Sequence, residues 1–194
     1  MQRNELESYW KYYLFLERKF IEATNYVELC EENKSTYSIE FHNQIISIGS
    51  ELDSFFKAYC GMNLNDTKTI TDYARHILKA TEYPAIVNEI ITVKNEYKWE
   101  IQPFENWNIS KPKQSLFWWE AFDNLKHGRK MNMKEASLSN ALNLLSALFL
   151  LEMKMHKITG GVNTPDIPDK ESELFSLNWK SDWRKMTDLY MYSD

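Results

Sequence analysis

The sequence predicts a mainly α protein, an up-and-down helical bundle of about five helices with a small β-hairpin insertion. Two patterns carry this prediction. Apolar residues recur every three or four positions over long stretches of the chain, which is typical of helices that bury one face. One stretch in the middle instead runs apolar or alternates with β-branched and aromatic residues, which is typical of strands.

Two long helices are predicted at the N-terminal end of the chain. The apolar positions of the first are Leu6, Tyr9, Tyr13, Leu16, Phe20, Ala23, Val27 and Cys30. Those of the second are Phe41, Ile45, Ile48, Leu52, Phe55 and Tyr59. Gly61 follows the second helix, as glycine commonly follows a helix C-terminus. Because the two apolar faces match in length, we expect the helices to pack as an antiparallel pair.

Three further helices complete the predicted bundle. The third covers about residues 68 to 80, and Ser115 is the expected N-cap of the fourth. The fifth covers about residues 134 to 157 and includes ALNLLSALFLL, which is apolar nearly all round. This run is too short to cross a bilayer but suits the central helix of a bundle.

The hairpin is predicted within an insertion of about residues 85 to 113, where IITV and YKWEI flank Lys94-Asn95-Glu96. We therefore expect one bundle domain, residues 1–160, that carries this insertion. Residues 161–194 are expected to form a C-terminal tail that packs on the bundle, with a last short helix around residues 183 to 190.

Composition and charge exclude several classes of protein. The net charge of −5 argues against broad, phosphate-driven binding to nucleic acid, although a local basic pocket stays open. No apolar run approaches the roughly 20 residues of a membrane span, and the N-terminus lacks an apolar signal core. We therefore expect a cytoplasmic protein with no membrane contact. Cys30 and Cys60 lack metal-type spacing and are expected to be buried free thiols.

The segment SLFWWEAFDNLKHGRK, residues 115–130, is the richest in functional groups. On a helix with about 100° per residue, its apolar and polar residues separate onto two sides. The core-facing side is formed by Trp118, Ala121, Phe122 and Leu125. The polar side is formed by Glu120, Asp123, Asn124 and His127. Gly128 follows, and then the cations Arg129 and Lys130.

This segment has two main interpretations, and its spacing alone does not decide between them. In the structural one, Gly128 ends the helix, the cations around it complement the helix dipole, and Asp123 pairs with His127 at i,i+4. In the functional one, His127 acts as general acid or base, while Arg129 stabilises an anionic phosphoryl transition state. Asn124 would then orient a ribose or a phosphate. A weaker third reading is that the cations simply bind phosphate or a nucleotide.

Two motifs of the chain resemble the HEPN (higher eukaryotes and prokaryotes nucleotide-binding) helical-bundle family. ELDSFFKAY, residues 51–59, is similar to the acid-apolar-Lys-Ala pattern of the family's second helix. Residues 124–129, Asn-Leu-Lys-His-Gly-Arg, are similar to an Asn … Lys-His-x-Arg variant of its polar motif. The resemblance implies an all-α homodimer, encoded in toxin–antitoxin or phage-defence systems, with paired polar motifs at the dimer cleft. Active members are ribonucleases that need no metal and no cofactor.

Carried over to this chain, the resemblance makes His127 the acid or base, with Asn124 and Arg129 as the other catalytic residues. Substrate-binding roles are expected for Lys126, Lys130 and Glu51. No arginine stands four to six residues before His127, where the family's nuclease motif usually has one. This departure favours the alternative to an enzyme that acts on RNA, namely a non-catalytic module of the same fold that binds a cognate protein or a nucleotide.

Overall fold

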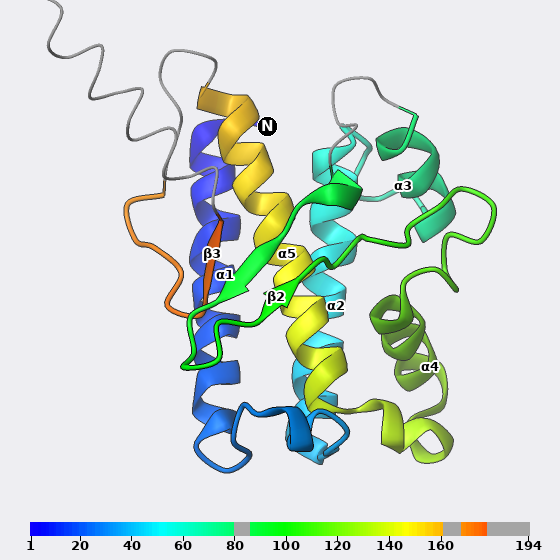
Figure 1. Cartoon of the computed structure of the whole chain (residues 1–194). Coiled ribbons are helices and arrows are strands. Elements are labelled where there is room, and N and C mark those ends of the chain that lie inside the picture. The colour runs from blue at the N-terminus through cyan, green and yellow to red at the C-terminus, as the bar shows by residue number, and fades with distance from the viewer. Residues whose placement is uncertain (80–85, 161–167, 178–194) are drawn as a thin grey trace, which may run out of the picture.

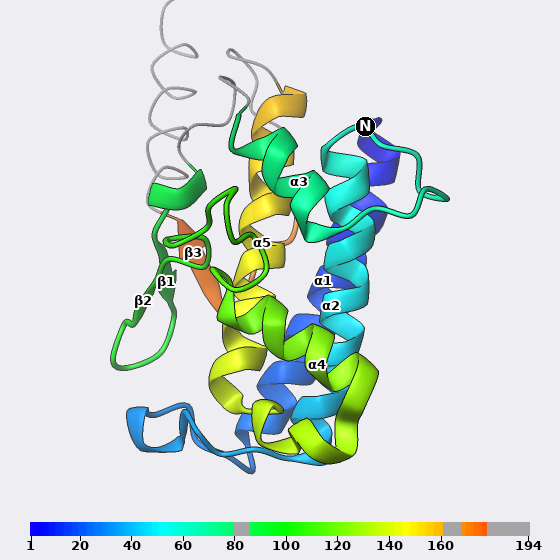
Figure 2. The same cartoon turned by 90° about the vertical axis from the view of Figure 1, so that its right-hand side faces the viewer.

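The computed structural model describes residues 1–79, 86–160 and 168–177 and has the predicted mainly α bundle (Figures 1 and 2). The helices are α1 (Arg3–Thr24), α2 (Ile39–Tyr59), α3 (Ile70–Ile77), α4 (Phe117–Asn132) and α5 (Leu138–Gly160). Short 3-10 turns cover Glu31–Asn33, Ile86–Asn88 and Met133–Glu135. The strands β1 (Ile91–Val93), β2 (Glu100–Ile101) and β3 (Phe175–Leu177) form one antiparallel sheet in the order β2-β1-β3. The predicted helix around residues 183 to 190 lies outside the described residues.

Helix α5 is the central element, as its all-round apolar sequence predicts. Figure 2 shows it between the sheet on one side and α1 and α2 on the other. Helices α1, α2 and α4 all pack against it, and fifteen of its 23 residues are buried. In the described part of the chain no helix is long and apolar enough to cross a membrane.

The predicted pair of N-terminal helices is present, but α1 ends earlier than expected. Its last residue is Thr24, whose hydroxyl donates to the Ile21 carbonyl, and the next backbone N–H groups fold back in a turn. Val27 still packs against the core from this turn, which explains why the apolar period continues past the helix. Cys30 is therefore only partly buried, contrary to expectation, whereas Cys60 is a buried free thiol as predicted.

The ends of α2 and α3 follow local capping chemistry. The Ser38 hydroxyl accepts the Phe41 N–H at 3.0 Å, and Gly61 takes a positive φ of 63° just after the helix. Helix α3 is shorter than the predicted 68 to 80. A capping box between Thr69 and Asp72 starts it at Ile70, two residues later than predicted, and it ends at Ile77.

The predicted hairpin is confirmed, with Ile91 opposite Ile101, and a third strand extends it. Strand β3 pairs with the other edge of β1 and buries Phe175 and Leu177. Glu17 of α1 anchors the same tail segment. Its carboxylate accepts the Tyr13 and Ser172 hydroxyls and the backbone N–H groups of residues 173 and 174, the last two at 2.9 and 3.1 Å. The described part of the tail thus lies against the bundle.

The seating of α4 on the bundle depends on a close approach at Gly49. A Cβ atom added to Gly49 would lie 2.3 Å from Cδ2 of Phe122 on α4. The Phe122 ring is buried and contacts the Trp119 ring at a centroid distance of 5.4 Å, so it has little room to move. The glycine thus allows α2 and α4 to pack closely.

We predict that Gly49→Ala destabilises the protein by about 1–3 kcal/mol, because overpacking at Phe122 outweighs the ordinary preference of a helix for alanine. Urea denaturation followed by circular dichroism measures the change. Ser50→Ala, at an exposed position of the same helix, is the control and should shift stability by less than about 0.5 kcal/mol. Adding Phe122→Leu should recover part of the loss. A Gly49→Ala variant as stable as the parent protein would contradict the close approach.

Candidate functional site

The polar side of α4 faces outward because the opposite, apolar side packs into the core. Trp118, Phe122 and Leu125 are buried, as the helical projection predicts. The residues left on the surface, which we term the α4 end, are Asp123, Asn124, Lys126, His127, Arg129 and Lys130. They are the predicted catalytic and substrate-binding residues, apart from Glu51, together with Asp123.

The beginning and the end of α4 differ from the predicted ones. Leu116, not Ser115, is the N-cap residue, because the Ser115 hydroxyl instead accepts the backbone N–H of Asn108 in the preceding loop. Helical geometry is interrupted at Gly128, with φ −155° and ψ 50°, but the chain continues helically to Asn132. The Asn132 side chain donates to the Asn124 carbonyl at 2.9 Å and so spans the interruption.

His127 is the most accessible group with acid–base chemistry at the α4 end. Its side chain is 72% exposed, and its Nε2 lies 3.5 Å from Oδ1 of Asp123. The other Asp123 oxygen accepts from Lys113 Nζ at 2.5 Å. Asp123 therefore lies between a lysine and the imidazole, where it can orient the ring. The predicted i,i+4 pair is confirmed.

Asn124 is directed away from His127 and towards the turn that precedes α5. Its Nδ2 donates to the two carboxylate oxygens of Glu135 at 3.1 and 3.2 Å. The Glu135 carbonyl in turn accepts the Asn140 side chain at 2.7 Å. The Asn124 amide thus joins α4 to the start of α5, and the structure does not bring it together with the imidazole. The sequence spacing correctly placed the two residues on one side of the helix, but it could not predict the directions of their side chains.

Three cations at the α4 end have no ion-pair partner among the described residues. Lys126, Arg129 and Lys130 are exposed, and the ammonium group of Lys126 lies 5.4 Å from the centre of the Phe122 ring. By contrast, Lys113 and Lys154 both form ion pairs. The α4 end therefore presents three uncompensated positive charges beside His127 in a chain of net charge −5.

Glu51 lies at a different place from the other predicted site residues. It is half-buried beside α1, where it lines a hollow with Glu5, Ser8, Tyr9 and Tyr12. Burial raises its pKa above the usual range for a carboxyl. Within the described ranges Glu51 makes no hydrogen bond or ion pair with the α4 end. The structure therefore does not bring Glu51 together with His127, although the sequence analysis placed both in one site.

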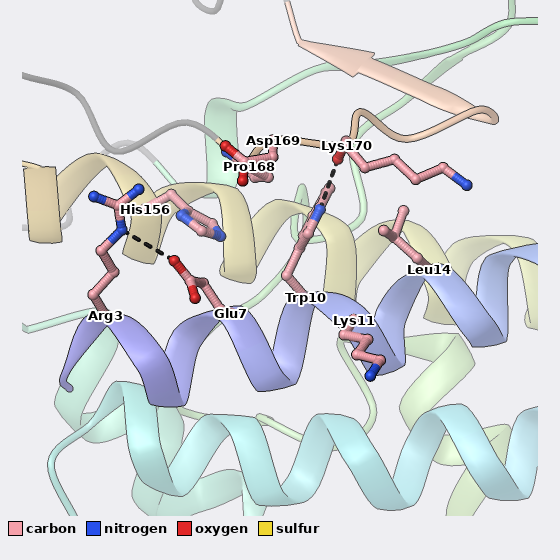
Figure 3. A pocket seen from close by; sticks show the side chains of 9 residues that line it. All are labelled: Arg3, Glu7, Trp10, Lys11, Leu14, His156, Pro168, Asp169 and Lys170. Atoms are coloured by element: carbon pink, nitrogen blue, oxygen red, sulfur yellow. Dashed lines mark hydrogen bonds and ion pairs between the residues drawn. The ribbon is translucent and has the colours of Figure 1, made fainter.

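A hollow of about 220 Å³ between α1, α5 and residues 168–170 contains a histidine that spacing did not single out as a site (Figure 3). His156 is 1% exposed, and its ring packs edge-on against the Trp10 ring at 5.8 Å. Trp10 Nε1 donates to the Lys170 carbonyl at 2.8 Å. Because both ring nitrogens of His156 are inaccessible to solvent, this arrangement favours packing over proton exchange with a substrate.

A metal centre finds no support in residues 1–79, 86–160 and 168–177. They contain no group of three or more His, Cys, Asp or Glu side chains placed to hold a metal ion. The groups able to act at the α4 end are therefore an imidazole, a carboxylate and three cations. This set suits phosphate binding and proton transfer.

We predict that Asn124→Ala destabilises the protein by about 1–2 kcal/mol, because the partly buried Glu135 carboxylate loses its hydrogen-bond donor. His127→Ala should change stability by less than about 0.5 kcal/mol, since the imidazole is mostly exposed. Parallel urea titrations of both variants measure the difference. Equal effects of the two substitutions would contradict the assignment of Asn124 to the joint between α4 and α5.

Comparison of the chain with known proteins identified no relative. No family model matches the chain, and neither a curated protein nor a solved structure does. The HEPN resemblance therefore rests on the two motifs in the sequence.

Proposed function

We propose that the protein is a helical-bundle module that binds RNA through the α4 end. The observation that carries this proposal is the group of three exposed cations, Lys126, Arg129 and Lys130, without an ion-pair partner in the described part of the chain. Uncompensated lysine and arginine side chains are the groups that bind phosphate oxygens. The net charge of −5 opposes broad binding of a polyanion, so the proposal is limited to this local group of cations.

The strength of such binding follows from the number of cations. Three phosphate contacts to a single strand correspond to a slope of about −2 in a plot of log affinity against log salt. His127, next to these cations, adds a charge when it is protonated. The proposed interaction is thus modest in affinity and sensitive to salt.

Cleavage of the bound RNA is the second candidate function, and the Asp123–His127 contact favours it. In this reaction the imidazole takes the proton of a 2′-hydroxyl, whose oxygen attacks the adjacent phosphorus. The bond to the 5′-oxygen breaks, and the products are a 2′,3′-cyclic phosphate and a 5′-hydroxyl. Arg129 or Lys126 would stabilise the charge that develops on the phosphoryl oxygens.

The second candidate function, cleavage of RNA, calls for a homodimer. The leaving 5′-oxygen needs a proton donor, while each chain places one histidine at its α4 end. A second copy facing the first would supply the other imidazole. Met131, 92% exposed, and Phe117, 53% exposed, are apolar side chains of α4 that are available for such an interface.

We predict that a labelled single-stranded RNA of ten nucleotides binds the protein, and that the triple variant Lys126→Ala, Arg129→Ala, Lys130→Ala weakens binding at least tenfold. Fluorescence anisotropy at several salt concentrations measures both the affinity and the slope. The control variant Lys11→Ala, Arg75→Ala, Lys79→Ala removes three exposed cations from other places and the same net charge. If both variants bind equally, the α4 end is not the RNA site.

We further predict that any cleavage of this RNA proceeds in the presence of EDTA and is lost in His127→Ala. His76→Ala, at another exposed histidine, should cleave as the parent protein does. Gel analysis of the products and light scattering on the eluting protein measure cleavage and dimer formation together. Binding without cleavage would leave the non-catalytic module as the function, whereas cleavage by His127→Ala would exclude the imidazole mechanism.

A further inference from the structure

Glu152, the one acidic residue of helix α5, is buried without a partner. It is 0% exposed, and neither of its side-chain oxygens has a hydrogen-bond partner in the described part of the chain. Glu17, the other buried glutamate among the described residues, shows the usual arrangement, since its carboxylate accepts four hydrogen bonds from hydroxyl and backbone N–H groups. Buried polar groups are nearly always paired in this way, so Glu152 is an exception that needs a physical reason.

Glu152 lies on the side of α5 that faces α1. Phe149, one turn earlier, packs against the Trp10 and Tyr13 rings with centroid distances of 6.1 and 5.7 Å. His156, one turn later, meets the Trp10 ring edge-on (Figure 3). Residues three and four apart on a helix share one side, so Glu152 lies between these two contacts. Its carboxyl group is thus enclosed where the two helices meet, which we term the α1–α5 seam.

The titratable groups around this carboxyl give it no fixed positive charge. Tyr9 and Tyr13 of α1 and Glu51 of α2 interact with it electrostatically. Burial raises the pKa of both tyrosines above the usual range, so the phenols stay neutral below about pH 10. Glu51 has the same sign of charge as Glu152. His156 follows on α5 itself, but Glu152 accepts no hydrogen bond from it, and no described lysine or arginine forms an ion pair with Glu152.

Ionisation of Glu152 is strongly unfavourable in this place. A carboxylate loses its hydration on burial, and here neither a cation nor a hydrogen-bond donor replaces the lost water. Burial, and then the charge of Glu51, raise the pKa of Glu152 well above the usual range for a carboxyl. The closed seam therefore accommodates the neutral acid, whereas a carboxylate at this position is stable only where water can reach it.

We propose that Glu152 makes closure of the α1–α5 seam depend on a proton. The closed seam holds the carboxyl group in its neutral form. When the proton is lost to solvent at higher pH, α1 moves away from α5 and the carboxylate becomes hydrated. The hollow of about 220 Å³ that contains Trp10 and His156 lies in the same seam, so opening of the seam widens this hollow.

The direction of the pH dependence follows from proton linkage. Above the ordinary carboxyl pKa of 4.5, and up to the raised pKa of Glu152, the closed protein binds one proton more than the open or unfolded chain. Stability therefore falls as the pH rises through this window. A carboxylate that is ion-paired in the folded state has the opposite effect, because its contribution is lost as the pH falls. For one proton, the equilibrium constant of unfolding rises by up to about tenfold per pH unit.

Urea denaturation of the full chain between about pH 5 and about pH 8 tests the proposal. Over this range the unfolding equilibrium constant of the parent protein should rise by a factor about tenfold or more larger than that of Glu152→Gln, which cannot ionise. Glu105→Gln, at an exposed acid of the loop before α4, makes the same change in net charge and should keep the parental pH dependence. The same pH dependence in the parent protein and in Glu152→Gln would overturn the proposal.

Hydrogen–deuterium exchange locates the opening within the chain. Between about pH 6 and about pH 8, protection factors corrected for the intrinsic exchange rate should fall in α1 and in the part of α5 around Glu152. They should fall less in α4, and the difference should be absent from Glu152→Gln. A fall of equal size in α4, or none in α1, would overturn the assignment to the α1–α5 seam.

NMR of the side-chain carboxyl carbons follows the same proton without a substitution at Glu152. In Glu51→Gln, which removes the other half-buried carboxyl of this region, one glutamate signal should still titrate above about pH 6. This measurement decides the question even where Glu152→Gln does not fold. If every glutamate signal of Glu51→Gln titrates below that pH, Glu152 does not hold its proton in the closed seam, and the proposal fails.

Discussion

Burial of α5 on all sides is the constraint on which the rest of the structure depends. A helix that is apolar nearly all round is stable in water only when other elements cover each of its faces. Helices α1 and α2 cover one side, α4 a second, and the sheet a third (Figure 2). The short strands belong to this cover, since β1 and β3 bury Ile91, Val93, Phe175 and Leu177.

The same constraint determines where polar chemistry can lie. Helix α4 uses Trp118, Phe122 and Leu125 to cover its neighbours, so its lysines, arginine and histidine must face water. On α5 itself, polar residues have no outward face over most of its length. Glu152 is consequently enclosed next to α1 and α2, and the bundle has a carboxyl group where its core would otherwise be apolar.

Several charged side chains have no ion-pair partner in the described part of the chain. Among the described residues, they include Lys126, Arg129 and Lys130 at the α4 end and, beside Tyr9, the acids Glu5 and Glu51. The net charge of −5 does not reveal these groups, because it sums the charges of the whole chain. The cations of the α4 end are the ones on which the proposed binding of phosphate groups depends.

Local patterns were sufficient for much of the fold. Residues 39–59 form a helix with the predicted apolar face and the predicted terminal glycine, and Ile91 pairs with Ile101 in the predicted hairpin. The apolar pattern was misleading where a residue outside a helix is buried at the position that the helical period would predict. Val27 keeps the helical apolar period although α1 has already ended, because a turn can also deliver a side chain to the core.

The sequence by itself determined the mainly α class, the central position of α5 and the outward polar side of α4, since each depends on periodicity along one segment. Only the tertiary structure decided that β3 joins β1, that Asn124 bonds to Glu135, and that Glu51 lies beside Tyr9. These contacts join different elements, and their partners are chosen by how the elements pack. Periodicity tells which side of a helix a residue occupies, whereas the direction of a polar side chain depends on the donors and acceptors that packing brings within reach.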